Sequence, residues 1–188
     1  MVSRVLLSLL IVFSAASFTH AAEVAGVKIP DEDQNLVLNG AGLRKRAFFQ
    51  VYAIGLYLPE KKTGAAEAIG AAGRKRVVIH MLRDVNADQF SEALMEGMKD
   101  NHGEAEMKAL EPRARQLTAI MAEMKEARKG MRITLDWFSA AGTTVTVDGR
   151  SAGLPILGED FYRALLKIWL GDNPVQADLK AALLGGKQ

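Results

Sequence analysis

The sequence predicts an α+β domain in which a large, mostly antiparallel sheet is covered by helices. Strand-like segments are grouped along the chain and do not alternate regularly with helices, so a parallel doubly wound sheet is not expected. The residues from 131 to 154 read as consecutive strands joined by short turns. Amphipathic helical stretches stand between and after the strand groups, and each offers one apolar face to a sheet.

The first 22 residues are interpreted as a secretory signal peptide. Arg4 supplies a positive start, Val5 to Phe18 are almost all apolar or small, and Thr19-His20-Ala21-Ala22 provides small residues for cleavage. The apolar run of about 14 residues is shorter than the roughly 20 needed to span a bilayer. We therefore expect residues 23–188 to be exported as one domain, without stable membrane insertion after cleavage.

The composition argues against several classes of protein and site. The sequence contains no cysteine, which excludes disulfides and thiol chemistry. Its 24 Lys and Arg nearly balance 22 Asp and Glu, so no nucleic-acid-binding charge is expected. The basic runs at 44–46, 61–62 and 74–76 are interpreted as solvated turns. His80 and His102 have no carboxylate at ligand spacing, and no nucleotide-binding motif is present, so neither metal nor cofactor is expected.

The first 60 residues are rich in strand-forming segments. Val24 to Ile29 predicts a short first strand, and Leu36 to Leu38 a second. Gly40-Ala41-Gly42 predicts a turn or bulge, because glycine adopts backbone angles that other residues avoid. A long strand is expected from Phe48 to Leu58. Since side chains alternate along a strand, Tyr52 and Tyr57 should lie on opposite faces.

The middle of the chain predicts one strand between helices. Ala65 to Ala72 is alanine-rich and is followed by Gly73, which is typical of a short helix and its end. Val77 to Leu82 is a β-branched run and is expected to be a central strand. Asn86, with Gln89 three residues later, resembles a capping box that opens the next helix.

The last 85 residues or so predict helices around a β-meander. Pro112 is expected to split the helical stretch from 104 to 129 into two helices. The meander comprises 131–138, 143–147 and 150–154, with a hairpin turn at Asp148-Gly149 and with Asp136 facing solvent. Two further helices are expected, over 158–171 and over 176–184.

The segment Gly40-Ala41-Gly42-Leu43-Arg44, followed by Val51-Tyr52-Ala53-Ile54-Gly55-Leu56-Tyr57-Leu58, resembles the signature of the chalcone isomerase family. The resemblance extends to Asp88-Gln89-Phe90-Ser91-Glu92 and to Ile168-Trp169-Leu170-Gly171-Asp172. It is greatest for bacterial, exported chalcone isomerase-like proteins, which implies a periplasmic location. It also implies an open-faced β-sandwich, in which a large antiparallel sheet is overlaid by helices with a cleft between them.

The resemblance does not by itself imply the isomerase reaction. Plant enzymes of the family cyclise a chalcone with an arginine, a threonine on the Ala-Ile-Gly strand, and a tyrosine and an asparagine on a later helix. The arginine corresponds to Arg44, but the other three positions hold Tyr52, Phe90 and Gly97. Phe90 and Gly97 have no polar side-chain group, so neither can donate a hydrogen bond to an oxyanion.

The non-catalytic branch of the family gives a better match. Its plant fatty-acid-binding members hold a carboxylate with an arginine on the glycine-rich segment and a tyrosine that opens the next strand. Arg44 and Tyr52 stand at these positions. The expected function is therefore binding of a fatty acid or a similar amphipathic anion in an apolar cleft. The alternative is an intramolecular lyase or isomerase of unknown substrate that uses Arg44 as electrophile.

The binding hypothesis sets a geometric condition on Arg44 and Tyr52. If a single extended strand joined them, eight steps of about 3.3 Å would place them roughly 26 Å apart. Convergence therefore requires a turn around Lys45-Arg46-Ala47. Without it, Arg44 is an ordinary turn cation and Tyr52 a core aromatic residue with a solvated hydroxyl. A third interpretation is an interaction module that presents the basic residues of the stretch 113–129 to a partner.

Overall fold

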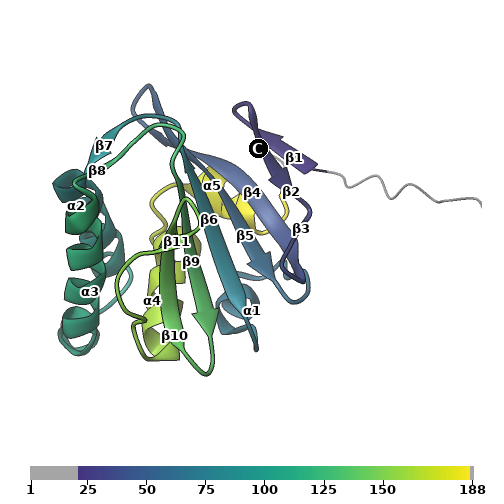
Figure 1. The fold of residues 1–188 in the computed structure, drawn as a ribbon. Coiled ribbons are helices and arrows are strands. Elements are labelled where there is room, and N and C mark those ends of the chain that lie inside the picture. The colour runs from purple at the N-terminus through teal and green to yellow at the C-terminus, as the bar shows by residue number, and fades with distance from the viewer. Residues whose placement is uncertain (1–20, 187–188) are drawn as a thin grey trace, which may run out of the picture.

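The computed structural model describes residues 21–186 and contains a curled, seven-stranded antiparallel sheet (Figure 1). The strand order is β11-β10-β9-β6-β5-β4-β3, so the α+β class and the predominance of antiparallel pairing are confirmed. The strands are β3 (Glu32–Asp33), β4 (Leu36–Arg46), β5 (Phe49–Leu58), β6 (Lys75–Met81), β9 (Arg132–Phe138), β10 (Gly142–Val147) and β11 (Arg150–Ser151).

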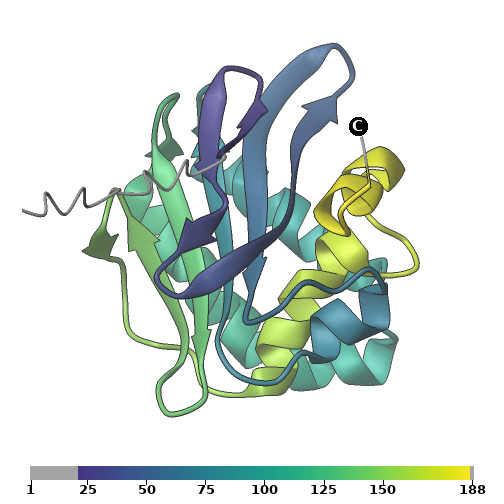
Figure 2. The same cartoon turned by 90° about the vertical axis from the view of Figure 1, so that its right-hand side faces the viewer.

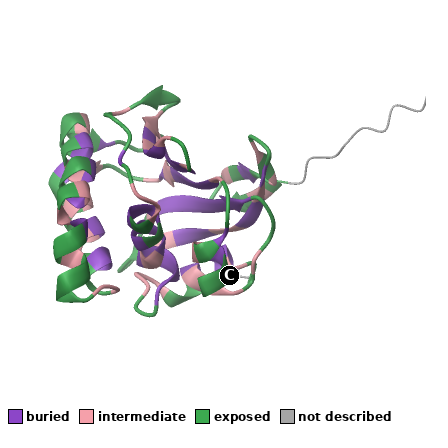
Figure 3. Cartoon of the chain, turned by 90° about the horizontal axis from the view of Figure 1, so that it is seen from below, coloured by how far each residue is buried: buried purple, intermediate pink, exposed green. Residues whose placement is uncertain are grey.

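The helices lie over one face of this sheet and bury the main core against it (Figure 2). Seen from below, the buried sides of α2 and α3 are turned toward the sheet (Figure 3). None of the helices in residues 21–186 combines the length and hydropathy that a membrane span requires. The helices are α1 (Ala65–Gly70), α2 (Ala87–Lys99), α3 (Glu104–Met124), α4 (Glu159–Leu170) and α5 (Ala177–Leu183).

A smaller core lies on the other face of the sheet, under an N-terminal hairpin. This hairpin is formed by β1 (Ala21–Val24) and β2 (Val27–Pro30), so the prediction of one strand over Val24 to Ile29 was wrong. The chain reverses at Ala25-Gly26, where both residues have positive φ (50° and 80°). Ile29 packs in this second core beside Tyr57, which confirms that Tyr57 and Tyr52 face opposite ways.

Residues 1–20 lie outside the described residues, so most of the predicted signal peptide does too. β1 begins at Ala21, next to the expected cleavage position. The removal of residues 1–22 therefore stays a prediction.

The glycine-rich segment Gly40-Ala41-Gly42 does not turn the chain, because it lies inside the continuous strand β4. A shift in register between Leu38 and Gly40 marks the predicted irregularity. Gly40 does not have a left-handed φ; instead, a Cβ built there would lie 2.1 Å from the carbonyl oxygen of Ala182. Glycine is required because α5 crosses the strand at this point, and not for the backbone angles on which the prediction rested.

Pro112 does not divide the helical stretch, because α3 continues through it from Glu104 to Met124. The prediction of two helices was wrong. The buried residues Leu110 and Ala114 flank the proline and belong to one stripe that packs on the core. A proline inside a helix costs about 3 kcal/mol, and burial of this long apolar stripe offsets that cost.

The basic run at 74–76 is not a solvated turn, and Asp136 does not face solvent. Arg76 and Asp136 are cross-strand partners, and only 5% and 3% of their surfaces are exposed. Arg76 donates two hydrogen bonds to the Asp136 carboxylate, at 2.7 and 2.8 Å, and pairs with Asp33 at 2.8 Å. Lys75 is fully buried and pairs with Glu159 at 2.9 Å. Charge alone could not reveal that β3 and α4 bring carboxylates to these positions.

The other predicted elements are present, although the last strand of the meander is shorter than the predicted 150–154 and comprises only β11. Asp148-Gly149 forms the hairpin turn between β10 and β11, with positive φ at both residues. The side chain of Asn86 caps α2 by accepting a hydrogen bond from the Gln89 amide at 2.8 Å. Directly beside this cap, β7 (Val85–Asn86) pairs with β8 (Glu126–Ala127) in a separate two-stranded sheet.

Candidate ligand-binding cleft

A cleft of about 680 Å³ lies between the helix-covered face of the sheet and the helices α2, α3 and α4. Its deep part is apolar, and the buried side chains that line it come from strands as well as helices. Charged and aromatic residues that are exposed to solvent line its open end. The deep residues include Ile79, Ile133, Leu135, Val145, Leu117 and Met121; the open end includes Arg46, Phe49 and Arg83.

The hairpin formed by β4 and β5 brings Arg44 and Tyr52 together. The chain turns at Ala47-Phe48, where Ala47 has a φ of 53°, and Arg44 is paired in register with Tyr52. Residues directly opposite in an antiparallel pair project from the same face, and their Cβ atoms are about 5 Å apart. The turn that the binding hypothesis requires is therefore present, and both residues line the cleft. It begins later than predicted, because residues 44–46 belong to β4, and the interpretation of this basic run as a solvated turn was wrong.

Trp169 of α4 fixes the hydroxyl of Tyr52. The indole Nε1 donates a hydrogen bond of 2.9 Å to the Tyr52 oxygen. Because the indole N–H is a donor only, the phenol acts as acceptor in this bond and keeps its own proton to donate elsewhere. Only 7% of Tyr52 is exposed, so its position is set by packing as well as by this bond.

Gln176, just before α5, orients Arg44. Its Oε1 accepts hydrogen bonds from Arg44 Nη1 at 3.3 Å and from the Lys45 amide at 2.8 Å, and its Nε2 donates to the Leu43 carbonyl at 3.0 Å. Arg44 Nη1 also donates to the Lys45 carbonyl at 2.6 Å. These bonds engage Nη1, and the Arg44 side chain also interacts with the Tyr52 hydroxyl. A guanidinium carries five N–H groups, so further donors remain for an anion.

The sequence patterns predicted Arg44 and Tyr52 but missed the residues that support them. Trp169 was named only within the segment that resembles the family, and Gln176 only marked the start of a predicted helix. A buried tryptophan needs a partner for its indole N–H, and that signal could have drawn attention to Trp169. Gln176 gave no such signal, because only the packing of α5 against β4 brings it to Arg44.

His80 is not one of the residues that line the cleft. His80 is on the strand face that carries Val78 and the second core, and its pKa is lowered by burial and by the nearby charge of Arg132. Among the described residues, no group of three or more histidines and carboxylates is arranged to hold a metal ion.

Comparison with known proteins gives the family of the chain. The sequence pattern described as chalcone isomerase-like matches residues 21–185. The chain belongs to the chalcone isomerase-like family. No curated protein matches the sequence. Among solved structures, a fatty-acid binding protein of Arabidopsis thaliana is similar, with a TM-score of 0.65 and 18% identity over 85% of this chain and 92% of that chain. At this identity the likeness shows the chalcone isomerase-like fold alone.

Phe90 and Gly97, which stand at two positions where the chalcone isomerase enzymes carry polar side chains, both line the cleft. Neither supplies a polar side-chain group. A Cβ at Gly97 would lie 2.8 Å from Ile168 Cγ2 and 3.3 Å from Val175 Cγ1. Gly97 therefore marks a close approach of α2 to α4, and an asparagine there would displace both neighbours.

Burial of tyrosine hydroxyls predicts a loss of stability in alkali. Burial raises the pKa of Tyr52 above 10.0, although Trp169 and Arg44 oppose this, and burial raises the pKa of Tyr162 further. When the pKa of a group is higher in the folded than in the unfolded state, its contribution to stability is fully present at a pH below the unfolded-state pKa. That contribution is lost as the pH rises toward the folded-state pKa. We expect the free energy of unfolding to fall above pH 10, by up to about 1.4 kcal/mol per pH unit for each tyrosine.

This effect can be measured by urea unfolding at neutral pH and at about pH 11, with tryptophan fluorescence as the signal. In Tyr162→Phe the decline should be smaller, because that variant has one ionisable hydroxyl fewer. An equal decline in both proteins would exclude Tyr162 as its source.

Proposed function

We propose that this protein binds a fatty acid or a similar amphipathic anion in the cleft and does not catalyse a reaction on it. The observation that carries the proposal is the pairing of Arg44 with Tyr52 at the wall of an apolar cavity. A guanidinium makes a bidentate pair with a carboxylate, and the phenol proton adds a further hydrogen bond. The apolar lining of the deep part suits a hydrocarbon tail.

The support for an anion at Arg44 is electrostatic as well as geometric. A cation and a neutral hydroxyl donor side by side favour a negatively charged group over a neutral one. The pKa of Tyr52 is raised by burial, which keeps the hydroxyl protonated and able to donate at neutral pH. The similar Arabidopsis thaliana protein is described as a fatty-acid binding protein, which agrees with this ligand class.

The enzymatic alternative has less support. An intramolecular lyase must stabilise charge that develops on the substrate, and preorganised donors usually supply that stabilisation. Phe90 and Gly97 leave the α2 side of the cleft without such donors at the two family positions. If Arg44 served as an electrophile in an isomerase, a substrate screen would find turnover that Arg44→Ala abolishes.

We also propose that residues 1–22 are a signal peptide and that the mature domain is periplasmic. The apolar run and the small residues before Glu23 support this. Intact-mass measurement of the protein from the periplasmic fraction tests it. A mass that still includes residues 1–22, in protein recovered only from the cytoplasm, would contradict it.

Native mass spectrometry of the purified protein is the direct test of ligand binding. We expect a co-purified lipid of fatty-acid mass, and a rise in melting temperature when a long-chain fatty acid is added. A fatty alcohol of the same chain length is the matched control, because it has the tail without the carboxylate. Absence of a co-purified lipid together with an unchanged melting temperature would overturn the proposal, and an equal effect of acid and alcohol would remove Arg44 as the anchor.

A further inference from the structure

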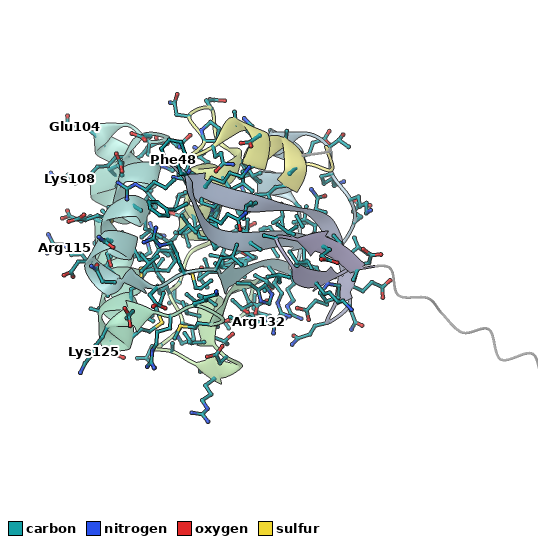
Figure 4. All side chains as sticks on the ribbon, turned by 90° about the horizontal axis from the view of Figure 1, so that it is seen from above. Phe48, Glu104, Lys108, Arg115, Lys125 and Arg132 are labelled. Atoms are coloured by element: carbon teal, nitrogen blue, oxygen red, sulfur yellow. The ribbon has the colours of Figure 1, made fainter. Side chains whose placement is uncertain are left out.

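The connection between β4 and β5 exposes two adjacent phenylalanines to solvent. Phe48 is fully exposed (100%) and Phe49 is 58% exposed, although most large apolar side chains in the described residues are buried. The turn projects at one end of the molecule (Figures 1 and 2). Figure 4, which looks onto this end, shows Phe48 where the ribbon of the hairpin turns. A solvent-exposed aromatic pair at a turn has no role in the core and requires another explanation.

The surroundings of this turn are basic. Lys45 and Arg46 precede it and are exposed, and the Arg83 guanidinium lies 4.5 Å from the centre of the Phe49 ring. The loop after β8 reaches the same edge, because the Lys129 amide donates a hydrogen bond of 2.7 Å to Asp84. We use the name tip surface for Lys45, Arg46, Phe48, Phe49, Arg83 and Lys129.

The tip surface combines features that suit an anionic lipid bilayer better than another protein. Its four cations outnumber the two carboxylates beside them, Asp84 in the same loops and Asp178, which interacts electrostatically with Lys45. The charge of the tip surface is therefore complementary to anionic headgroups. Each Lys or Arg near such a membrane contributes about 1 kcal/mol of attraction. Aromatic side chains on a basic surface insert at the boundary between headgroups and acyl chains. The turn extends beyond its sheet neighbours, as insertion into a bilayer requires.

We propose that the tip surface docks on a bilayer that contains anionic phospholipid, with Phe48 inserted between the headgroups. The contact is peripheral, so no membrane-spanning segment is involved. Arg46, Phe49 and Arg83 also line the open end of the cleft, so docking places this opening against the lipid. Uptake or release of a ligand at the membrane rests on the proposed function. Docking of the tip surface does not depend on it.

Vesicle flotation tests the proposal with residues that do not line the cleft. We expect the protein to bind vesicles of equal parts phosphatidylcholine and phosphatidylglycerol, and to bind phosphatidylcholine alone much less. Phe48→Ser should weaken binding about tenfold, through loss of the buried ring. Lys45→Gln should weaken it about fivefold, through loss of one charge. Added salt should weaken binding as well, because it screens the headgroups.

Leu157→Ser is the matched control, since Leu157 is 69% exposed but lies beside Gly142, at the opposite end of the sheet. Its vesicle binding should equal that of the unmodified protein. All variants share one N-terminus, so any contribution of residues 1–22 is common to them. Equal binding by Phe48→Ser, or no preference for phosphatidylglycerol, would overturn the proposal. A change from dimer to monomer in Phe48→Ser, without a change in vesicle binding, would also overturn it. The turn would then be a self-association surface.

The fatty-acid melting assay on the same variants separates this proposal from the proposed function. Phe48→Ser and Lys45→Gln should keep the full melting-temperature response, because neither residue lines the cleft. Tyr52→Phe should lose part of that response and keep vesicle binding. If Tyr52→Phe lost both the melting-temperature response and vesicle binding, the inference that ligand binding and membrane docking use separate surfaces would be wrong.

Discussion

Arg44→Gln is expected to weaken fatty-acid binding about 30-fold or more, equivalent to about 2 kcal/mol. Glutamine keeps hydrogen-bonding capacity and approximate length but removes the charge that pairs with the carboxylate. The effect should be large because Arg44 sits beside the buried Tyr52 hydroxyl, at the wall of a cleft with an apolar interior. Isothermal titration with a long-chain fatty acid below its critical micelle concentration measures the loss.

Three further variants make the Arg44 result specific. Arg44→Lys keeps the charge without the bidentate geometry and should have an intermediate affinity. Arg46→Gln should have a smaller effect, because Arg46 is exposed at the open end of the cleft. Lys45→Gln should bind normally in solution, since Lys45 does not line the cleft. If Arg46→Gln lost more affinity than Arg44→Gln, the anchor would be Arg46 and the assignment to Arg44 would be wrong.

Gly40→Ala is expected to destabilise the protein by about 3 kcal/mol or more. The new methyl group would lie 2.1 Å from the Ala182 carbonyl oxygen and 2.6 Å from that of Leu183. Both atoms belong to the backbone of α5, so no side-chain rotation relieves the contact. The helix must move away from β4, and the hydrogen bond from Asn39 Nδ2 to the Leu183 carbonyl, 2.7 Å long, would be lost with it. Urea denaturation measures the change.

Gly70→Ala is the matched control for Gly40→Ala. Gly70 also lacks a left-handed φ, and a Cβ there would meet no atom within 4 Å. The substitution should be neutral or slightly stabilising, because Gly70 ends helix α1 and alanine favours the helix. A comparable loss of stability in both variants would mean that close approach to α5 is not the reason for glycine at position 40.

Local patterns predicted those features that depend on neighbouring residues. The Asp148-Gly149 turn, the Asn86 cap and the opposite orientation of Tyr52 and Tyr57 on β5 follow from residue type and spacing over a few positions. The predictions failed where distant segments decide the outcome. Pro112 remains helical because the stripe on both sides of it is buried, and Asp136 is buried because Arg76 stands opposite it on the next strand. The core that buries this stripe and the strand that carries Arg76 both lie far from these residues in sequence.

Patterns in the sequence predicted the α+β class, the family and the two residues proposed to hold an anion. These follow from periodicity and from the short segments around Arg44 and Tyr52, which are properties of contiguous residues. The convergence of the pair became evident only from the folded chain. Eight residues of extended chain would have separated the two side chains, but a turn at Ala47-Phe48 reverses the strand. The tertiary structure also brought Trp169 and Gln176 to the pair from more than 110 residues away. Such contacts depend on how helices pack on a sheet, which no local pattern encodes.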